Sequence, residues 1–185
     1  RPAWIKNLET SCTKWKELLP KTALEPLKSS AQAEKNPLFK SFEREVELGI
    51  RLLHDIGADL DDLLQVASGE VKQTNHLRAL MANLMRGILP KSWNRYQVTD
   101  STPFNQWLLD FAQRISQLQS DQIRMCTQSL DVNGVPSVWL GGLFFPEAFI
   151  TATRQRAARN NQWSLENLVV EAVVLDSEDA RKKAV

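Results

Sequence analysis

The stretch from residue 36 to residue 69 constrains the fold more than any other part of this sequence. It begins with Asn36-Pro37, an N-cap residue followed by a proline in the first turn, and stops at Ser68-Gly69. Between these signals, apolar residues recur in alternating steps of four and three positions over almost four heptads. The pattern predicts one long helix over residues 37–68 with a buried seam of Phe42, Val46, Gly49, Leu53, Ile56, Leu60, Leu63 and Ala67.

The seam of this helix needs a partner. A helix of this length spans roughly 45 Å, which is longer than a compact domain of this size requires. Two interpretations are open: the seam forms the core of a helical bundle within this protein, or it pairs with a coiled-coil helix of a second protein. We favour the bundle. In either case Gly49 predicts a close approach of another helix to the seam.

Three shorter helices are predicted around the long one. Apolar residues recur at helical spacing from residue 4 to residue 19, over residues 74–88 and over residues 103–119. Short connections make consecutive helices antiparallel neighbours. The segment over residues 20–36 carries prolines, serines and alternating Lys and Glu, and it is predicted as an irregular linker.

Beyond residue 120 the sequence favours a small β element. Two apolar runs, 138–145 and 168–175, are predicted as strands that pair with each other. The turn signal at residues 132–134 precedes the first of them, and a helix over residues 146–160 lies between them. We expect the charged tail, residues 176–185, to be disordered or weakly helical.

The predicted fold is therefore mainly α, of the α+β type. It is an antiparallel helical bundle with one long helix, plus a small two-stranded β element near the C-terminus. We expect three segments: a leading helix and linker over residues 1–36, the helical bundle over 37–120, and a strand, helix, strand unit with the charged tail over 121–185.

Charge and cysteine content limit the class of protein. The sequence has 23 basic and 22 acidic residues, so the whole surface is not expected to bind nucleic acid. No apolar run reaches about 18 residues, which predicts no membrane span. The two cysteines, Cys12 and Cys126, are predicted as buried thiols of a cytosolic protein rather than a disulfide. Four tryptophans at apolar positions are expected in the core, namely Trp4, Trp15, Trp107 and Trp139.

The sequence offers no recognisable reactive centre. It contains no phosphate-binding GxxxxGK[ST] motif, and its two histidines and two cysteines are too scattered for a zinc site. Residues 40–70 hold eight acidic and three basic side chains. These include Asp61-Asp62 and the group Glu43, Glu45 and Glu47, which we interpret as a solvated helix face. We therefore predict no catalytic, cofactor-binding or metal-binding residue in this protein.

A long motif near the C-terminus is shared with a known family. The run from Trp139-Leu-Gly-Gly-Leu-Phe-Phe-Pro-Glu147 to Thr151-Ala-Thr-Arg-Gln155, followed by Trp163-Ser-Leu-Glu166, closely resembles the C-terminal domain of dynein heavy chains. Upstream, Pro37-Leu-Phe-Lys-Ser-Phe42 and Gly87-Ile-Leu-Pro-Lys-Ser-Trp93 resemble the same domain in the same order. The resemblance covers nearly the whole sequence and is closer to the cytoplasmic than to the axonemal branch.

The resemblance implies a part of a minus-end-directed microtubule motor, located in the cytoplasm on the cytoskeleton. Such motors bind ATP and Mg²⁺ in a ring of AAA modules, assemble as homodimers with accessory subunits, and bind microtubules. The C-terminal domain follows the sixth AAA module and lies against the ring, so the implied partners are AAA modules of the same heavy chain. In many dyneins a β-barrel follows the last strand, whereas this sequence stops about ten residues after Leu175. Two interpretations are open: the source has a short form of the domain, or the sequence is cut from a longer one.

Two other function classes are compatible with parts of the sequence. One is a free-standing helical adaptor that uses the 37–68 seam to bind a partner coiled coil. The other is a small enzyme that uses Asp61 and Asp62 or the histidines, and it would require strongly perturbed titration of those groups in a cleft. The interpretation that we favour is a C-terminal regulatory and structural domain that packs on the AAA ring and performs no chemistry itself.

Overall fold

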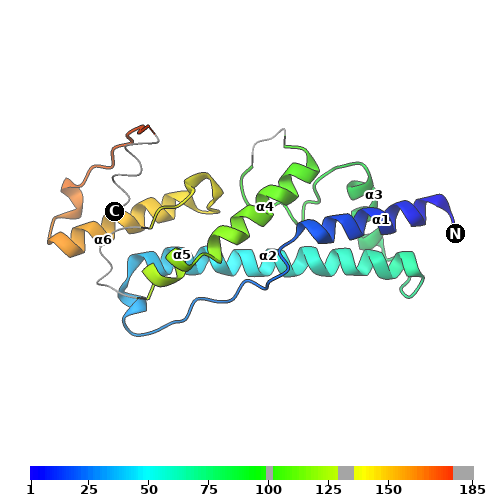
Figure 1. Cartoon of the computed structure of the whole chain (residues 1–185), viewed down its shortest axis with the longest axis horizontal. Helices are drawn as coiled ribbons and strands as arrows, with labels where there is room; N and C mark the ends of the chain where they lie inside the picture. The colour runs from blue at the N-terminus through cyan, green and yellow to red at the C-terminus, as the bar shows by residue number, and fades with distance from the viewer. Residues whose placement is uncertain (99–101, 129–135, 177–185) are drawn as a thin grey trace. The chain divides into compact units, whose positions relative to one another are not determined.

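The computed structural model describes residues 1–98, 102–128 and 136–176, and this part of the protein is mainly helical (Figure 1). The α-helices are α1 (Ala3–Leu18), α2 (Pro37–Ser68), α3 (Asn75–Met85), α4 (Phe104–Leu118), α5 (Asp121–Cys126) and α6 (Pro146–Asn161). Short 3-10 helices are η1 (Ala33–Lys35), η2 (Leu140–Gly142) and η3 (Leu165–Asn167). None of the helices in the described ranges is both long enough and apolar enough to cross a bilayer.

The long helix has the bounds that its sequence signals predict. Its C-terminus is closed by Gly69, whose φ of 85° is a left-handed conformation that glycine adopts without strain. The amide of Glu70 donates to the carbonyl of Gln65, and the amide of Gly69 donates to that of Val66. These two bonds satisfy the last carbonyls of the helix and form a Schellman motif.

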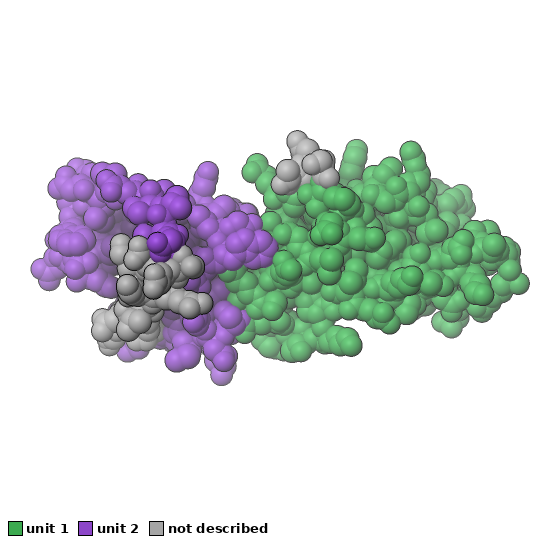
Figure 2. All heavy atoms as spheres, turned by 45° about the horizontal axis from the view of Figure 1, so that its top comes forward, with its two compact units in different colours: residues 1–26, 45–119 green, residues 27–44, 120–185 purple. Residues whose placement is uncertain are grey.

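The protein forms two compact units, which Figure 2 shows in green and purple. Unit 1 consists of Arg1–Pro26 and Glu45–Gln119, and unit 2 of Leu27–Arg44 and Ser120–Val185. Residues 37–44 of α2 therefore belong to unit 2 and the rest of α2 to unit 1. The three segments predicted from the sequence, with boundaries at 36/37 and 120/121, remain a prediction.

Unit 1 is an antiparallel arrangement in which α1 and α4 run in the opposite direction to α2 (Figure 1). The ring of Trp15 in α1 meets the ring of Phe104 in α4 edge to face, with centroids 5.3 Å apart. Gly49 lets α4 approach α2 closely, because a Cβ at this position would lie 3.0 Å from Cδ1 of Ile115. This confirms the close contact predicted from the glycine on the seam.

Unit 2 holds its helices together through backbone carbonyls as well as apolar packing. The side chain of Asn36 donates to the carbonyl of Cys126 at 2.9 Å, and its oxygen accepts from the amide of Leu38 at the start of α2. Nη1 of Arg159 in α6 donates to the carbonyl of Lys35 at 2.6 Å. Phe42 packs against Phe149 of α6, with ring centroids 5.7 Å apart.

The predicted two-stranded β element is not found among the residues that the structure describes. The first predicted strand, 138–145, contains η2, because the amide of Gly142 turns back to the carbonyl of Trp139. The second, 168–175, belongs to no strand in the structure. Both runs have strand-like composition, but a strand also needs a neighbouring backbone to pair with. The turn signal at 132–134 and residues 177–185 of the charged tail lie outside the described residues.

Candidate functional site

The predicted seam is covered by other parts of the same protein. Phe42, Val46, Ile56, Leu60 and Leu63 are buried, whereas Leu53 is only half-buried and its neighbour Leu52 is fully buried instead. The exchange is local to one turn, because Ile56, Leu60 and Leu63 further along the helix keep the predicted positions and are buried. Because these side chains are already buried, the seam is not available to a partner coiled coil.

The acidic side of α2 is used largely for contacts within unit 1. Oδ2 of Asp59 accepts a 2.7 Å hydrogen bond from Nε1 of Trp93, whose side chain is fully buried. Oδ1 of the same carboxylate lies 3.4 Å from Nε2 of His76 on α3. Asp59 therefore links α2 both to α3 and to the loop that follows it.

Two further carboxylates of α2 form ion pairs within unit 1. Asp55 accepts from Nη2 of Arg95 at 2.5 Å, and Asp61 pairs with Lys16 of α1. Both pairs are partly exposed, so each contributes little to stability, about 0–1 kcal/mol. Asp62 is exposed, as the solvated-face interpretation predicts, but Glu45 is buried and that interpretation is wrong for it.

The two cysteine thiols and the imidazole of His54 were the other candidates for reactive groups. Both thiols are free and buried. Burial raises the pKa of Cys12 to about 12, and burial is also the main cause that raises the pKa of Cys126 to about 11, so both thiols are protonated at neutral pH. His54 is exposed on α2. Within the described ranges no three His, Cys, Asp or Glu side chains gather to hold a metal ion.

A shallow depression of about 300 Å³ lies along the outer side of α4, lined by Val98, Thr102, Gln106, Leu109, Asp110, Gln113 and Arg114. Its two charged groups neutralise each other, because Nε of Arg114 donates to Asp110 at 2.7 Å. The buried guanidinium also lies over the ring of Tyr96, 4.6 Å from its centroid. These contacts fix the pair as part of the packing around α4.

The motif that resembles the dynein domain acts as a packing motif. The ring of Trp139 lies directly over Gly142, since a Cβ added to Gly142 would be 2.1 Å from Cε3 of the indole. Leu143 and Phe144 follow as buried residues, and the guanidinium of Arg44 lies 3.7 Å above the ring of Phe145. Only glycine fits beneath the indole, which gives the second glycine of the motif a structural reason.

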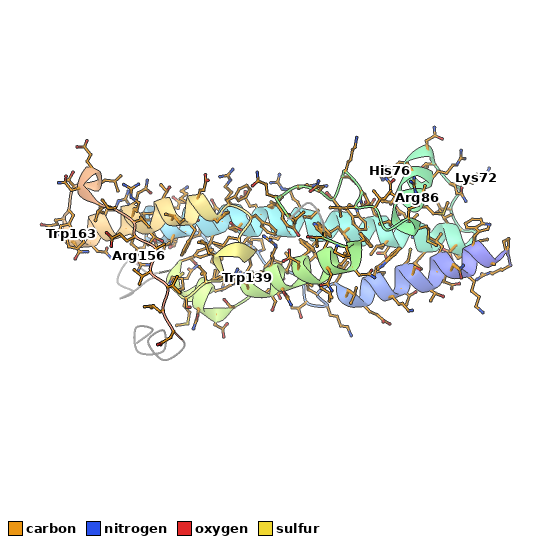
Figure 3. All side chains as sticks on the ribbon, turned by 90° about the horizontal axis from the view of Figure 1, so that it is seen from above. Lys72, His76, Arg86, Trp139, Arg156 and Trp163 are labelled. Carbon is orange, nitrogen blue, oxygen red and sulfur yellow. The ribbon has the colours of Figure 1, made fainter. Side chains whose placement is uncertain are left out.

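Large exposed apolar side chains mark the surface that the protein leaves uncovered. Trp15 and Trp107 are buried as predicted, but Trp4 and Trp139 are each 45% exposed, and the prediction of a core position is wrong for them. Trp163, which follows α6, is 56% exposed and lies well away from Trp139 within unit 2 (Figure 3). No role beyond the resemblance is predicted for Trp163, although its polar neighbours on both sides, Gln162 and Ser164, indicate exposure.

Comparison with known proteins gives one consistent result. Residues 5–185 match the family model for the C-terminal domain of the dynein heavy chain. The cytoplasmic dynein heavy chain of Drosophila melanogaster is 47% identical over 178 residues, which is 96% of this protein and 4% of the relative. That of Dictyostelium discoideum is 44% identical over 90% of this protein and 3% of the relative. The human dynein axonemal heavy chain 1 is 32% identical over 64% of this protein and 3% of the relative.

Proposed function

The protein belongs to the family of C-terminal domains of dynein heavy chains, and on this premise we propose that it packs on the AAA ring of a cytoplasmic dynein heavy chain and regulates the motor. The observation that carries the proposal is the family match over residues 5–185. Because the sequence spans about 4% of the length of the Drosophila relative, the activity of the whole motor is part of the proposal.

The cytoplasmic branch of the family is supported by the higher sequence identity to cytoplasmic than to axonemal heavy chains. Cytoplasmic heavy chains of Drosophila, Dictyostelium and Caenorhabditis elegans are 42–47% identical to this protein, compared with 32% for a human axonemal heavy chain. A place in the cytoplasm, on the cytoskeleton, follows from this branch. The full motor would be a homodimer with accessory subunits that binds microtubules and moves toward their minus ends.

This domain acts by contacting the AAA modules and does not itself catalyse a reaction. Its sequence lacks a phosphate-binding loop, so ATP and Mg²⁺ would be bound by the AAA modules elsewhere in the heavy chain. Side chains that could take part in catalysis have structural roles instead. Asp59 accepts a hydrogen bond from the indole of Trp93, and the two thiols are buried. The partners of the domain are AAA modules of the same heavy chain, especially the sixth.

The surface that meets those modules is best sought at exposed aromatic side chains. Tryptophan is enriched among the residues that dominate interface energetics, whereas exposed charges contribute little. Trp4 in unit 1 and Trp163 in unit 2 are both about half exposed, and among the glycines that the structure describes neither covers one as Trp139 does. The seam of α2, by contrast, is already covered. We therefore assign Trp4 and Trp163 to the contact with the ring.

Hydroxyl-radical footprinting tests this assignment, because it oxidises accessible indole rings. In the isolated domain Trp4 and Trp163 should react rapidly, while the buried Trp93 and Trp107 serve as internal controls that react slowly. In the full heavy chain the two exposed indoles should become protected and the two controls should not change. Equal oxidation of Trp4 and Trp163 in both forms would show that the ring does not cover them.

The assignment of nucleotide binding to other parts of the motor is tested separately, by thermal unfolding of the isolated domain. A ligand that binds only the folded state must raise its stability. Millimolar ATP with Mg²⁺ should leave the melting temperature unchanged. A reproducible increase would contradict the assignment.

A further inference from the structure

Helix α3 and the segments on either side of it form a basic surface of unit 1. Residues 71–98 contain five Lys or Arg residues and no Asp or Glu. Arg95 pairs with Asp55 of α2. The other four are exposed and form no ion pair with any carboxylate in the part of the protein that the structure describes: Lys72, Arg78, Arg86 and Lys91. Their charge is therefore available to an anionic partner.

Two of these cations lie on the side of α3 that points away from the core. The inner side of the helix is buried through Leu77, Leu80 and Leu84. The opposite side, which we call the outer face of α3, is exposed and consists of Arg78, Ala79, Ala82, Met85 and Arg86. Residues three and four positions apart on a helix are neighbours on the same side, so Ala82 lies at the centre of this face. The two alanines leave room for another helix to approach closely.

Both ends of α3 are fixed. The hydroxyl of Thr74 accepts a 3.1 Å hydrogen bond from the amide of Leu77 and caps the first turn. At the other end Gly87 has a φ of 70°, and the amide of Ile88 donates to the carbonyl of Asn83 at 2.8 Å. The outer face is therefore preorganised, and little ordering is required when a partner binds.

We propose that the outer face of α3 binds an acidic helix of the same heavy chain. This inference rests on the proposed function, in which the domain packs on the AAA ring. Arg78 and Arg86 are eight positions apart, which is about 12 Å along the helix axis. A partner helix matches this face if it carries two carboxylates seven or eight positions apart and an apolar residue between them. The charges select the partner and its register, while the apolar side chain packs on the alanines and Met85.

The size of the face indicates that the partner belongs to the same heavy chain. Helix α3 has 11 residues and is about 16 Å long, so its outer face is much smaller than the roughly 1,000 Å² of a stable contact between separate proteins. A tethered partner needs less area, because the linkage gives it an effective concentration of about millimolar. The sequence spans 4% of the Drosophila relative, so a heavy chain of that length has many other helices that could supply this partner.

Zero-length cross-linking of the full heavy chain tests the proposal. A carbodiimide couples an amine to a carboxylate only when the two groups touch. Arg78→Lys and Arg86→Lys keep the positive charge and give the outer face an amine, which it otherwise lacks. Each variant should form a new cross-link, identified by mass spectrometry, to a carboxylate of one helix outside residues 1–185. The control Arg51→Lys changes an exposed arginine of α2 and should cross-link within α2 instead, at Glu47 or Asp55.

Charge reversal tests the same contact with a different readout. In the full heavy chain, Met85 should be protected from hydroxyl radicals, and the double substitution Arg78→Glu, Arg86→Glu should increase its oxidation several-fold. The buried Trp93 and Trp107 should react slowly in both proteins, which verifies that the variant is folded. The control Arg51→Glu reverses an exposed charge on α2 and should leave Met85 protected.

Three results would overturn the proposal. They are the absence of a cross-link from both positions of the outer face, a cross-link only within residues 1–185 or to a different protein, and equal oxidation of Met85 in the wild type and the reversal variant. Trp4 and Trp163 report on the proposed function in the same wild-type sample. If they are protected while Met85 is not, this inference fails and the packing on the ring stands.

Discussion

The indole nitrogen of Trp93 donates a 2.7 Å hydrogen bond to Oδ2 of Asp59, so a fully buried tryptophan depends on a carboxylate at the partly exposed side of the long helix. The acidic side of α2 therefore stabilises contacts within unit 1. Its carboxylates hold the loop after α3, α3 itself and α1, and fewer of them are free to meet a partner than the net charge of the segment suggests.

Removal of this acceptor should be costly. Asp59→Ala leaves the buried indole N–H of Trp93 without its partner, and an unsatisfied buried donor costs about 1–3 kcal/mol of unfolding free energy. Asp62→Ala removes an exposed carboxylate from the same helix and should cost less than about 0.5 kcal/mol. Urea denaturation of both variants measures the difference. Equal losses would mean that the bond to Trp93 does not matter for stability.

The neighbouring leucines Leu52 and Leu53 provide a matched test of the seam. Leu52→Ala truncates a fully buried side chain and should cost about 2–5 kcal/mol, as should Ile56→Ala. Leu53→Ala acts on a half-buried side chain and should cost clearly less, about 1 kcal/mol. Chemical denaturation in the same buffer compares the three variants. A larger loss at Leu53 than at Leu52 would restore the strict heptad register predicted from the sequence.

The tight contact between Trp139 and Gly142 predicts a coupled pair of substitutions. Gly142→Ala places a methyl group where the ring of Trp139 lies, and overpacking of this kind costs about 1–3 kcal/mol. In a Trp139→Ala background the same glycine substitution should be nearly neutral, because the ring is gone. A double-mutant cycle measures the coupling energy. Simple additivity of the two single losses would contradict the contact.

The buried thiols predict how stability depends on alkaline pH. The pKa of Cys12 rises to about 12 and that of Cys126 to about 11 on folding, compared with an ordinary value of 9.0. Below pH 9 both the folded and the unfolded protein keep these protons. Between pH 9 and pH 11 only the unfolded protein loses them, so the free energy of unfolding should fall by about 1.4 kcal/mol per pH unit for each thiol.

Urea melts of the wild-type protein across this pH range check the slope. The control is the Cys12→Ala, Cys126→Ala variant, in which the fall should be shallower by the contribution of both thiols. Tyr96, whose pKa is also raised by burial, remains in both proteins and does not affect the comparison. The same slope in the variant would show that the thiols do not titrate differently on folding.

The sequence predicts the helical part of the fold well because local signals coincide with the tertiary packing. Asn36-Pro37 and Gly69 mark the ends of α2, and the positive φ of Gly69 is a conformational reason for that glycine. Helix α5 is not predicted. Its signals are short: Ser120 before the helix, and two buried residues on one face, Ile123 and Cys126. A helix this brief offers too few periods to be distinguished from a loop.

The sequence is a weaker guide where the role of a residue depends on a distant partner. Trp93 lies in a segment without periodicity, and only the structure shows that Asp59 receives its N–H. Residues 168–175 have the composition of a strand, but composition does not reveal whether another backbone lies beside them. The family, in contrast, is recognisable from the sequence, because it depends on sequence similarity over residues 5–185 and not on knowing which residues are in contact.

The central claim, that this domain acts on the motor through contacts and not through chemistry, is tested most directly in a full heavy chain with both Trp4→Ala and Trp163→Ala. Single-molecule motility should be measured beside bulk ATP binding, with His54→Ala as the control for an exposed residue of α2. We predict a several-fold change in run length or stall force for the tryptophan variant, with ATP binding unchanged and the control like the wild type. Unchanged motility of the tryptophan variant would contradict the account.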